Sequence, residues 1–207
     1  MPIVTGVVER RGRVRIFVDG EFWAELDSRI AVEHGLLEGA VFSQAGLAKA
    51  RLAGEKSLAM NQALSILGYR ARAKGELHER LVRAGYAGET AAIVVTRLEE
   101  LGYLDDEKFA RNLAGDQANK KYGPRRILDN LRRVGVDEEI AREAVNEQFV
   151  ERSEYQTALT AARRRYNTEE KGCDAQVRRV YGFLMRRGYS AVVCAEVARA
   201  YRQETSE

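Results

Sequence analysis

The hydrophobic positions follow two different spacings along the chain. In roughly the first 45 residues, Val7–Arg10, Val14–Val18 and Glu21–Leu26 are rich in β-branched and aromatic residues, and Asp19-Gly20 is a strong hairpin turn. These patterns predict three short strands, with Trp23, the only tryptophan, as their core anchor. A sheet this small is marginally stable alone, so we expect it to pack on another part of the chain.

A different spacing follows the predicted strands. Ser28 is expected to cap a short helix that ends near Gly35. From Ser57 onward, apolar residues recur every three or four positions in successive groups, a pattern typical of amphipathic helices. The capping pair Asp105-Asp106 and the first-turn proline Pro124 mark two helix starts in this region.

A six-residue phrase, Leu-x-x-x-Gly-[Tyr/Val], recurs in the helical region. It predicts a Schellman helix stop, in which glycine takes the left-handed conformation and the leucine packs on the residue after the glycine. A fifth match, Leu64–Tyr69, runs into a continuing helical pattern at Arg70 and Arg72, so it is not taken as a stop. The four predicted stops are Leu81–Tyr86, Leu98–Tyr103, Leu131–Val136 and Leu184–Tyr189.

Three of these stops carry an arginine at the last helical position, and their leucines lie 50 and 53 residues apart. Such spacing indicates a repeat. The sequence therefore predicts a mainly α protein, an elongated tandem array of three three-helix repeats behind a small β-rich domain. The expected domains are residues 1–56 for the β-rich part, and 57–106, 107–151 and 152–207 for the repeats.

The chemistry of known enzyme sites is missing from the sequence. There is no phosphate loop, dinucleotide turn, zinc-protease motif or nucleophile elbow. Cys173 and Cys194 fit no metal-pair spacing, and His78 is interpreted as a surface residue. No apolar run approaches the about 18 residues of a spanning helix, and no signal peptide is evident. We expect a cytoplasmic, non-enzymatic and monomeric protein without metal, cofactor or membrane contact.

Clusters of basic residues are the remaining candidates for function. The net charge is only +3, and residues 152–207 hold 11 basic against 7 acidic side chains, so the positive excess lies at the C-terminal end. Arginine predominates in the clusters, and it binds carboxylates and phosphates in a bidentate fashion. Solvated helix faces are the plainer interpretation of any single cluster. The candidates are Arg70, Arg72, Lys74, Arg83, Lys120, Lys121, Arg125, Arg126, Arg132, Arg133, Arg163, Arg164, Arg165, Arg178, Arg179, Arg186 and Arg187.

Several strings in the repeats match a known family. They are Ala63-Leu64-x-x-Leu67-x-x-Arg70-x-Arg72, Glu76-Leu77-x-x-x-Leu81, Leu98-x-x-x-Gly102-Tyr103-Leu104-Asp105-Asp106-x-x-Phe109-Ala110 and Gly123-x-x-Arg126-Ile127-x-x-x-Leu131-x-x-x-Gly135-Val136. Over roughly residues 58–201 the chain resembles the RecX regulatory proteins, and the Gly-Tyr-Leu-Asp-Asp string is the most specific part. The β-rich part looks like the N-terminal extension of some members. Ala73 departs from the family, which often has serine there.

The resemblance implies a modulator of the RecA recombinase. Such proteins are helical arrays that lie in the groove of the RecA–DNA filament, bridge protomers, and suppress ATP hydrolysis and strand exchange. Some also bind single- or double-stranded DNA. Two alternatives remain at this point: a stand-alone DNA-binding protein whose units act as helix-turn-helix readers, and a helical scaffold for another protein. Near-zero net charge over residues 58–151 disfavours the first of these.

Overall fold

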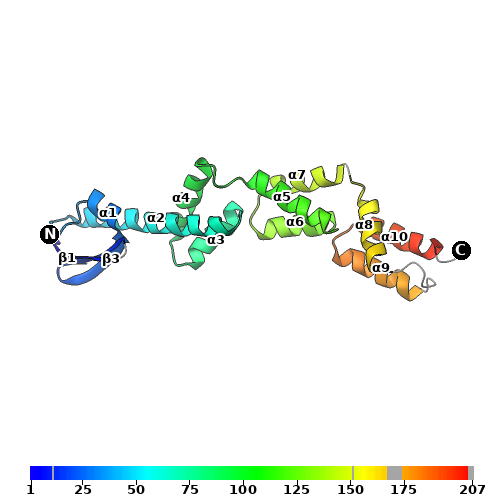
Figure 1. Ribbon diagram of the computed structural model, residues 1–207, viewed down its shortest axis with the longest axis horizontal. Helices are drawn as coiled ribbons and strands as arrows, with labels where there is room; N and C mark the ends of the chain where they lie inside the picture. The colour runs from blue at the N-terminus through cyan, green and yellow to red at the C-terminus, as the bar shows by residue number, and fades with distance from the viewer. Residues whose placement is uncertain (11, 151, 167–173, 205–207) are drawn as a thin grey trace. The chain divides into compact units, whose positions relative to one another are not determined.

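The N-terminal part is a three-stranded antiparallel sheet in the order β1-β2-β3, formed by Val4–Arg10, Arg13–Val18 and Glu21–Asp27 (Figure 1). A computed structural model describes the chain except for residues 11, 151, 167–173 and 205–207. Asp19 and Gly20 have φ angles of 50° and 87°, as a tight hairpin turn requires. The predicted strands and their turn are confirmed.

One face of the sheet packs on helices. Val14, Ile16 and Leu26 point to this face and are at most 5% exposed. Trp23 is only partly buried and lies at the margin of the same core, so its expected role as the anchor was wrong. The reason is the strand alternation, because Ala24 and Leu26 take the inward positions of β3.

Two helices follow the sheet. Helix α1, Ser28–Glu33, is capped by Asp27, whose carboxylate accepts a hydrogen bond from the backbone N–H of Arg29. The expected cap, Ser28, instead donates its hydroxyl to the carbonyl of Gly12 in the turn after β1. Helix α2, Gln44–Tyr69, begins well before Ser57, where the helical pattern was expected to start. The pattern missed the first half of α2 because this half is rich in small residues and shows no strong apolar stripe.

Helix α2 belongs to the sheet at one end and to the first repeat at the other. At Gly54 an added Cβ would lie 2.1 Å from the Leu26 side chain, so the glycine lets the helix and sheet approach. The boundary expected between residues 56 and 57 therefore falls inside α2. The second half of α2 packs with α3, Lys74–Arg83, and α4, Gly88–Glu100 (Figure 1), around a core that includes Leu77 and Leu98.

The chain divides into two compact units. The first contains residues 1–72 and 76–104, and the second contains residues 73–75 and 105–207. The second unit holds two further three-helix repeats. These are α5, Asp106–Asn119, with α6, Pro124–Arg133, and α7, Glu138–Val150, and then α8, Glu154–Arg165, with α9, Asp174–Arg186, and α10, Ala191–Glu204. The predicted architecture of three three-helix repeats behind a small sheet is confirmed.

All four predicted helix stops are Schellman motifs. In each, the residue after the glycine donates its N–H to the carbonyl of the leucine, at 3.2 Å for Leu81, 2.9 Å for Leu98, 3.1 Å for Leu131 and 3.3 Å for Leu184. The four glycines have φ angles between 76° and 100°. The fifth match, Leu64–Tyr69, was expected to run on as helix through Arg70. Instead α2 ends at Tyr69, and Arg70 is extended with φ of −164°.

Capping residues open two helices of the second repeat as expected. Asp105 accepts a hydrogen bond from the N–H of Lys108 at 2.8 Å, and Pro124 occupies the first turn of α6 after Gly123. Asp106, expected as the other member of the capping pair, instead makes a contact distant in sequence that the pattern did not reveal. Its side chain is 6% exposed and accepts a hydrogen bond from the backbone N–H of Lys74 at 2.9 Å.

Backbone-to-backbone contacts at glycines join neighbouring elements of the second unit. Gly123 donates its N–H to the carbonyl of Arg187 at 2.8 Å, and an added Cβ on Gly123 would lie 2.5 Å from the backbone of Gly188. Gly75 makes a similar approach to Gly135, where an added Cβ would lie 2.7 Å from the Gly135 Cα. A side chain at Gly123 or Gly75 would collide with the facing backbone. Glycine at these two positions therefore lets the neighbouring helices approach and sets their register.

We predict that Gly123→Ser destabilises the protein by about 2 kcal/mol, the scale of overpacking in a dense interface. Gly123 has φ of −82°, which any residue adopts, and serine is a good helix cap, so only the contact with Gly188 opposes the change. Urea unfolding measures the loss. The control is Gly115→Ala inside α5, where the new Cβ meets Gln148 at an ordinary 3.6 Å and should be neutral or stabilising. Equal stability of the two variants would contradict the prediction.

Candidate partner-binding surface

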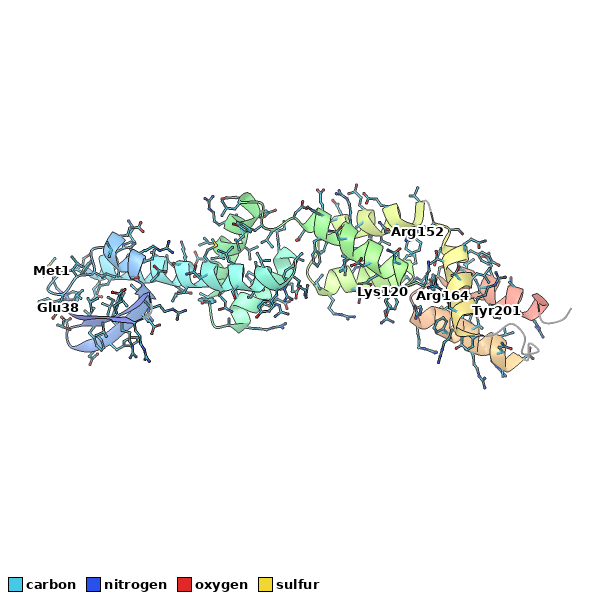
Figure 2. The ribbon with its side chains drawn as sticks, viewed as in Figure 1. Met1, Glu38, Lys120, Arg152, Arg164 and Tyr201 are labelled. Carbon is cyan, nitrogen blue, oxygen red and sulfur yellow. The ribbon has the colours of Figure 1, made fainter. Side chains whose placement is uncertain are left out.

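Six basic residues meet where the second and third repeats join. We call Lys120, Lys121, Arg125, Arg126, Arg186 and Arg187 the junction cluster. Two short segments carry it, residues 120–126 after α5 and residues 186–189 at the end of α9, and neither contains an acidic residue. Lys120 is labelled in Figure 2 at the C-terminal end of α5. The structure thus brings together candidates that lie about 60 residues apart in sequence.

Hydrogen bonds hold the two segments in place. Arg187 donates Nη1 to the carbonyl of Lys120 at 2.7 Å, and Arg126 donates Nη1 to the carbonyl of Arg186 at 3.1 Å. The Tyr189 hydroxyl donates to the carbonyl of Lys121 at 2.9 Å. Burial raises the pKa of Tyr189 above its usual range, so this hydroxyl keeps its proton. Arg126 and Arg187 therefore stabilise the junction through hydrogen bonds and also add to its positive charge.

An aromatic ring lies among these cations. The Tyr122 ring has the Arg126 guanidinium 4.3 Å from its centroid and that of Arg187 at 5.1 Å. The Arg187 guanidinium also lies 5.0 Å from the Phe183 centroid. Cation–π contacts at partly exposed sites contribute about 0.5–1 kcal/mol each. Tyr122 consequently serves to position two arginines rather than to offer a free ring for base stacking.

The remaining cations of the junction cluster are available to a partner. Lys120, Arg125 and Arg186 are exposed, and none has a carboxylate within 4.0 Å among the residues that the structure describes. Lys121 is half-buried and holds a left-handed backbone with φ of 62°. Three exposed charges on a rigid backbone are suited to bind carboxylates or phosphates.

The candidates of the first repeat are engaged within the protein. Arg70, Arg72 and Arg80 all donate to the same carboxylate oxygen of Glu76, and the side chain of Arg72 is only 10% exposed. Burial alone would raise the pKa of Glu76, but hydrogen bonds from Arg72 and Arg80 outweigh it and the pKa is lowered. This cluster is a half-buried structural network.

Other candidates near the first repeat also have local contacts. Arg83 pairs with Glu79 one helical turn earlier at 2.7 Å, with both side chains exposed. Lys74 starts α3 with its backbone N–H held by Asp106. Exposed pairs of this kind contribute about 0–1 kcal/mol, so the Arg83 pair can exchange for a partner's carboxylate at little cost.

Two adjacent arginines at the end of α6 differ in their surroundings. Arg132 forms a fork with Glu138, at 2.5 Å from Nη2 and 2.6 Å from Nε, and Glu138 also pairs with Arg142. These hydrogen bonds, led by that of Arg132, lower the pKa of Glu138 to about 2. Arg133 is exposed with no carboxylate within 4.0 Å in the described part of the chain.

The third repeat carries the last candidates on α8 and α9. Arg163, Arg164 and Arg165 end α8, where cations favour the helix dipole, and Arg178 and Arg179 lie on α9; all five are exposed. Tyr166, which follows the three arginines at the end of α8, is half-buried with its ring 5.7 Å from that of Phe183. Lys171 and Cys173 lie outside the described residues. Burial raises the pKa of Cys194 to about 11, so its thiol stays protonated.

Sequence reasoning missed the residues that hold the junction together. From the sequence, Tyr189 was singled out only as part of a helix stop, and Tyr122 was assigned no role. The available signal was that the Tyr-Gly-Pro string and the Arg-Gly-Tyr string each place an aromatic residue next to a glycine beside basic residues. Over the described residues, no helix is long and apolar enough to span a membrane, and no group of three metal-binding side chains gathers.

The geometry defines the class of protein: a helical-repeat protein with a cation-rich junction between two repeats. The three repeats match the family models for the first, second and third three-helix domains of RecX, over residues 59–98, 105–145 and 153–197. Together with the relatives described next, these matches show that the chain belongs to the RecX family, a family of regulatory proteins.

Among the relatives, the regulatory protein RecX of Mycolicibacterium smegmatis is 32% identical over 144 residues, which is 67% of this chain and 77% of that protein. The regulatory protein RecX of Lactobacillus johnsonii is 33% identical over 150 residues, 71% of this chain but only 55% of the relative, so the match spans about half of that longer protein. A crystal structure of a regulatory protein RecX shares the fold, with a TM-score of 0.69 at 20% identity over 96% of this chain and all of the other.

We predict that the Arg132–Glu138 fork makes stability depend on acid pH. The folded-state pKa of Glu138 lies below its ordinary 4.5, so the stabilisation is complete above pH 4.5 and is lost as the pH falls toward about 2. Glu138→Gln should therefore lower stability at pH 7, and its difference from the unchanged protein should shrink below pH 4.5. Urea unfolding across this range measures it, and a difference independent of pH would contradict the assignment.

Proposed function

We propose that the protein is a non-enzymatic regulator that binds the RecA recombinase and its filament on DNA in the cytoplasm. It inhibits ATP hydrolysis and strand exchange, and in this way modulates DNA repair and recombination. Membership in the RecX family supports a regulatory role, and the relatives bear the name regulatory protein RecX. The names of these relatives are those of regulatory proteins and not of enzymes, which is consistent with a non-enzymatic role.

The junction cluster is the surface that carries this proposal. A recombinase filament on DNA offers both carboxylates and phosphates, and exposed arginine and lysine side chains bind either. The arginine candidates of the first repeat are already paired with Glu76 and Glu79, whereas Lys120, Arg125 and Arg186 keep their charges open to solvent. Docking at the junction therefore requires no internal ion pair to break.

The Gly123–Gly188 contact adds to this argument. Because backbone hydrogen bonds join the two repeats at the junction, the backbone segments that carry the three open cations are held together before a partner arrives. A surface that needs no ordering keeps more of its interaction energy as affinity. A regulator that must hold neighbouring recombinase subunits benefits from such a rigid contact.

We predict that the triple variant Lys120→Glu, Arg125→Glu and Arg186→Glu inhibits the recombinase at least about tenfold less effectively. Reversed charges repel an anionic surface and remove its contacts, and a tenfold change corresponds to about 1.4 kcal/mol. The measurement is RecA-dependent ATP hydrolysis on single-stranded DNA as a function of added protein. No inhibition by the unchanged protein at stoichiometric amounts would refute the proposed function itself.

The matched control is the triple variant Arg97→Glu, Arg111→Glu and Arg142→Glu. It changes the net charge equally, but each of these arginines already pairs with a glutamate on its own helix face. We expect it to inhibit within about threefold of the unchanged protein, since exposed pairs contribute little. Equal loss in both variants would mean that net charge, rather than the junction cluster, governs inhibition.

The alternative of a stand-alone DNA-binding protein predicts a different result. It requires tight, sequence-selective binding to duplex DNA without recombinase, with a steep salt dependence. Capture of the protein's partners from cell extract, with and without nuclease, separates the cases. A recombinase that remains bound after nuclease treatment supports direct protein contact, whereas loss of every partner would favour the alternative.

A further inference from the structure

The sheet of the N-terminal part has a second face that helices do not cover. Strand pairing places three rows of residues on it: Gly6, Phe17 and Phe22; Val8, Arg15 and Glu25; and Arg10, Arg13 and Asp27. The intervening positions Val14, Ile16, Ala24 and Leu26 are buried against α1 and α2, which confirms that these rows point outward. We call these rows the outer sheet face.

The outer sheet face is hollowed and positively charged. A cavity of about 470 Å³ is lined by Arg10, Arg13, Arg15 and Glu25. Glu25 pairs with Arg13 at 3.3 Å, and Asp27 is occupied as the cap of α1 and partner of Arg29. Arg10 and Arg15 have no carboxylate within 4.0 Å among the described residues, so they leave two net positive charges in the hollow.

Aromatic rings lie directly beside these arginines. The Arg15 guanidinium is 5.2 Å from the centroid of the Phe22 ring, and Phe17 meets Phe22 edge-on at 6.0 Å. Phe22 is nevertheless 53% exposed. Its exposed ring next to a cation is suited to stacking on a planar, anionic ligand.

We propose that the outer sheet face binds single-stranded nucleic acid. Arg10, Arg13 and Arg15 hold the phosphates, and an unpaired base stacks on Phe22. Three strands about 4.8 Å apart give a face wide enough for two or three nucleotides, the number that sheet-based RNA readers stack. A duplex keeps its bases stacked on each other and offers no ring to Phe22, and an acidic peptide would leave the aromatic row without a role.

This site goes beyond the proposed function, because it needs no recombinase. It lies in the first unit, and the junction cluster lies in the second. One residue makes the two sites distinguishable in the full chain. Trp23, the only tryptophan, is next to Phe22 on β3 in the first unit, so its fluorescence is expected to respond to binding at the outer sheet face.

The test measures binding of a fluorescein-labelled oligothymidylate of about 12 nucleotides to the full protein. Anisotropy gives the affinity, and Trp23 emission locates the site. The double variant Arg10→Glu and Arg15→Glu should bind at least about tenfold more weakly and lose the Trp23 response. Its slope of log affinity against log salt should fall by about 1.4, because each phosphate contact to a single strand contributes about 0.7.

The matched control is Lys49→Glu with Lys56→Glu, two lysines on α2, which covers the opposite face of the sheet. It changes the net charge equally and should bind within about threefold of the unchanged protein. Phe22→Leu keeps an apolar side chain on the strand but removes the aromatic ring, and should weaken binding about five- to tenfold with an unchanged salt slope.

Competition distinguishes the ligands. Oligouridylate should compete if both nucleic acids are accepted, and not if the strand must be DNA, whereas a duplex of the same length should compete poorly. Absence of oligothymidylate binding, no Trp23 response, or equal weakening by the α2 control would each overturn the proposal. The junction variants should retain the Trp23 response, so the failure of either proposal leaves the other to be judged separately.

Discussion

The close approach of one backbone to another at glycine is the constraint on which the rest of the second unit depends. Gly188 ends α9 with a positive φ of 85° and also receives the start of α6 at a separation that excludes any Cβ. The same residue thus stops a helix and sets the register of two repeats. Gly85, the corresponding stop in the first repeat, has no neighbour within 4 Å of an added Cβ, so only its φ of 100° requires glycine.

This contact determines which cations can act on a partner. Arg126 and Arg187 contact backbone carbonyls across the junction and the Tyr122 ring, so their guanidinium groups hold the second and third repeats together. Lys120 and Arg125 lie on the same segment but keep exposed side chains. Neighbouring basic residues therefore differ in role: some stabilise the junction, and others keep their charges exposed to solvent. Only the tertiary contacts distinguish the two groups.

The sequence predicted what depends on neighbours along the chain. The Schellman stops, the Asp19-Gly20 turn and the Asp105 cap are local, because each needs only a few adjacent residues with defined conformations. The prediction failed where distant residues compete for the same group. Ser28 donates its hydroxyl to the carbonyl of Gly12 while Asp27 caps α1. Arg70 and Arg72, expected in a continuing helix, instead lie beyond the end of α2 and pair with Glu76. The candidate site was therefore predicted as residue types and not as an arrangement.

Both proposed surfaces combine aromatic rings with arginines, but they do so on different elements and in different arrangements. At the junction cluster, aromatic Tyr122 positions the cations Arg126 and Arg187 beneath an open set of charges. On the outer sheet face the order is reversed, because Phe22 itself stays exposed with Arg15 beside it. A ring covered by arginines cannot stack on a base, whereas an exposed ring can. This difference favours a mainly electrostatic contact at the junction and base stacking at the sheet.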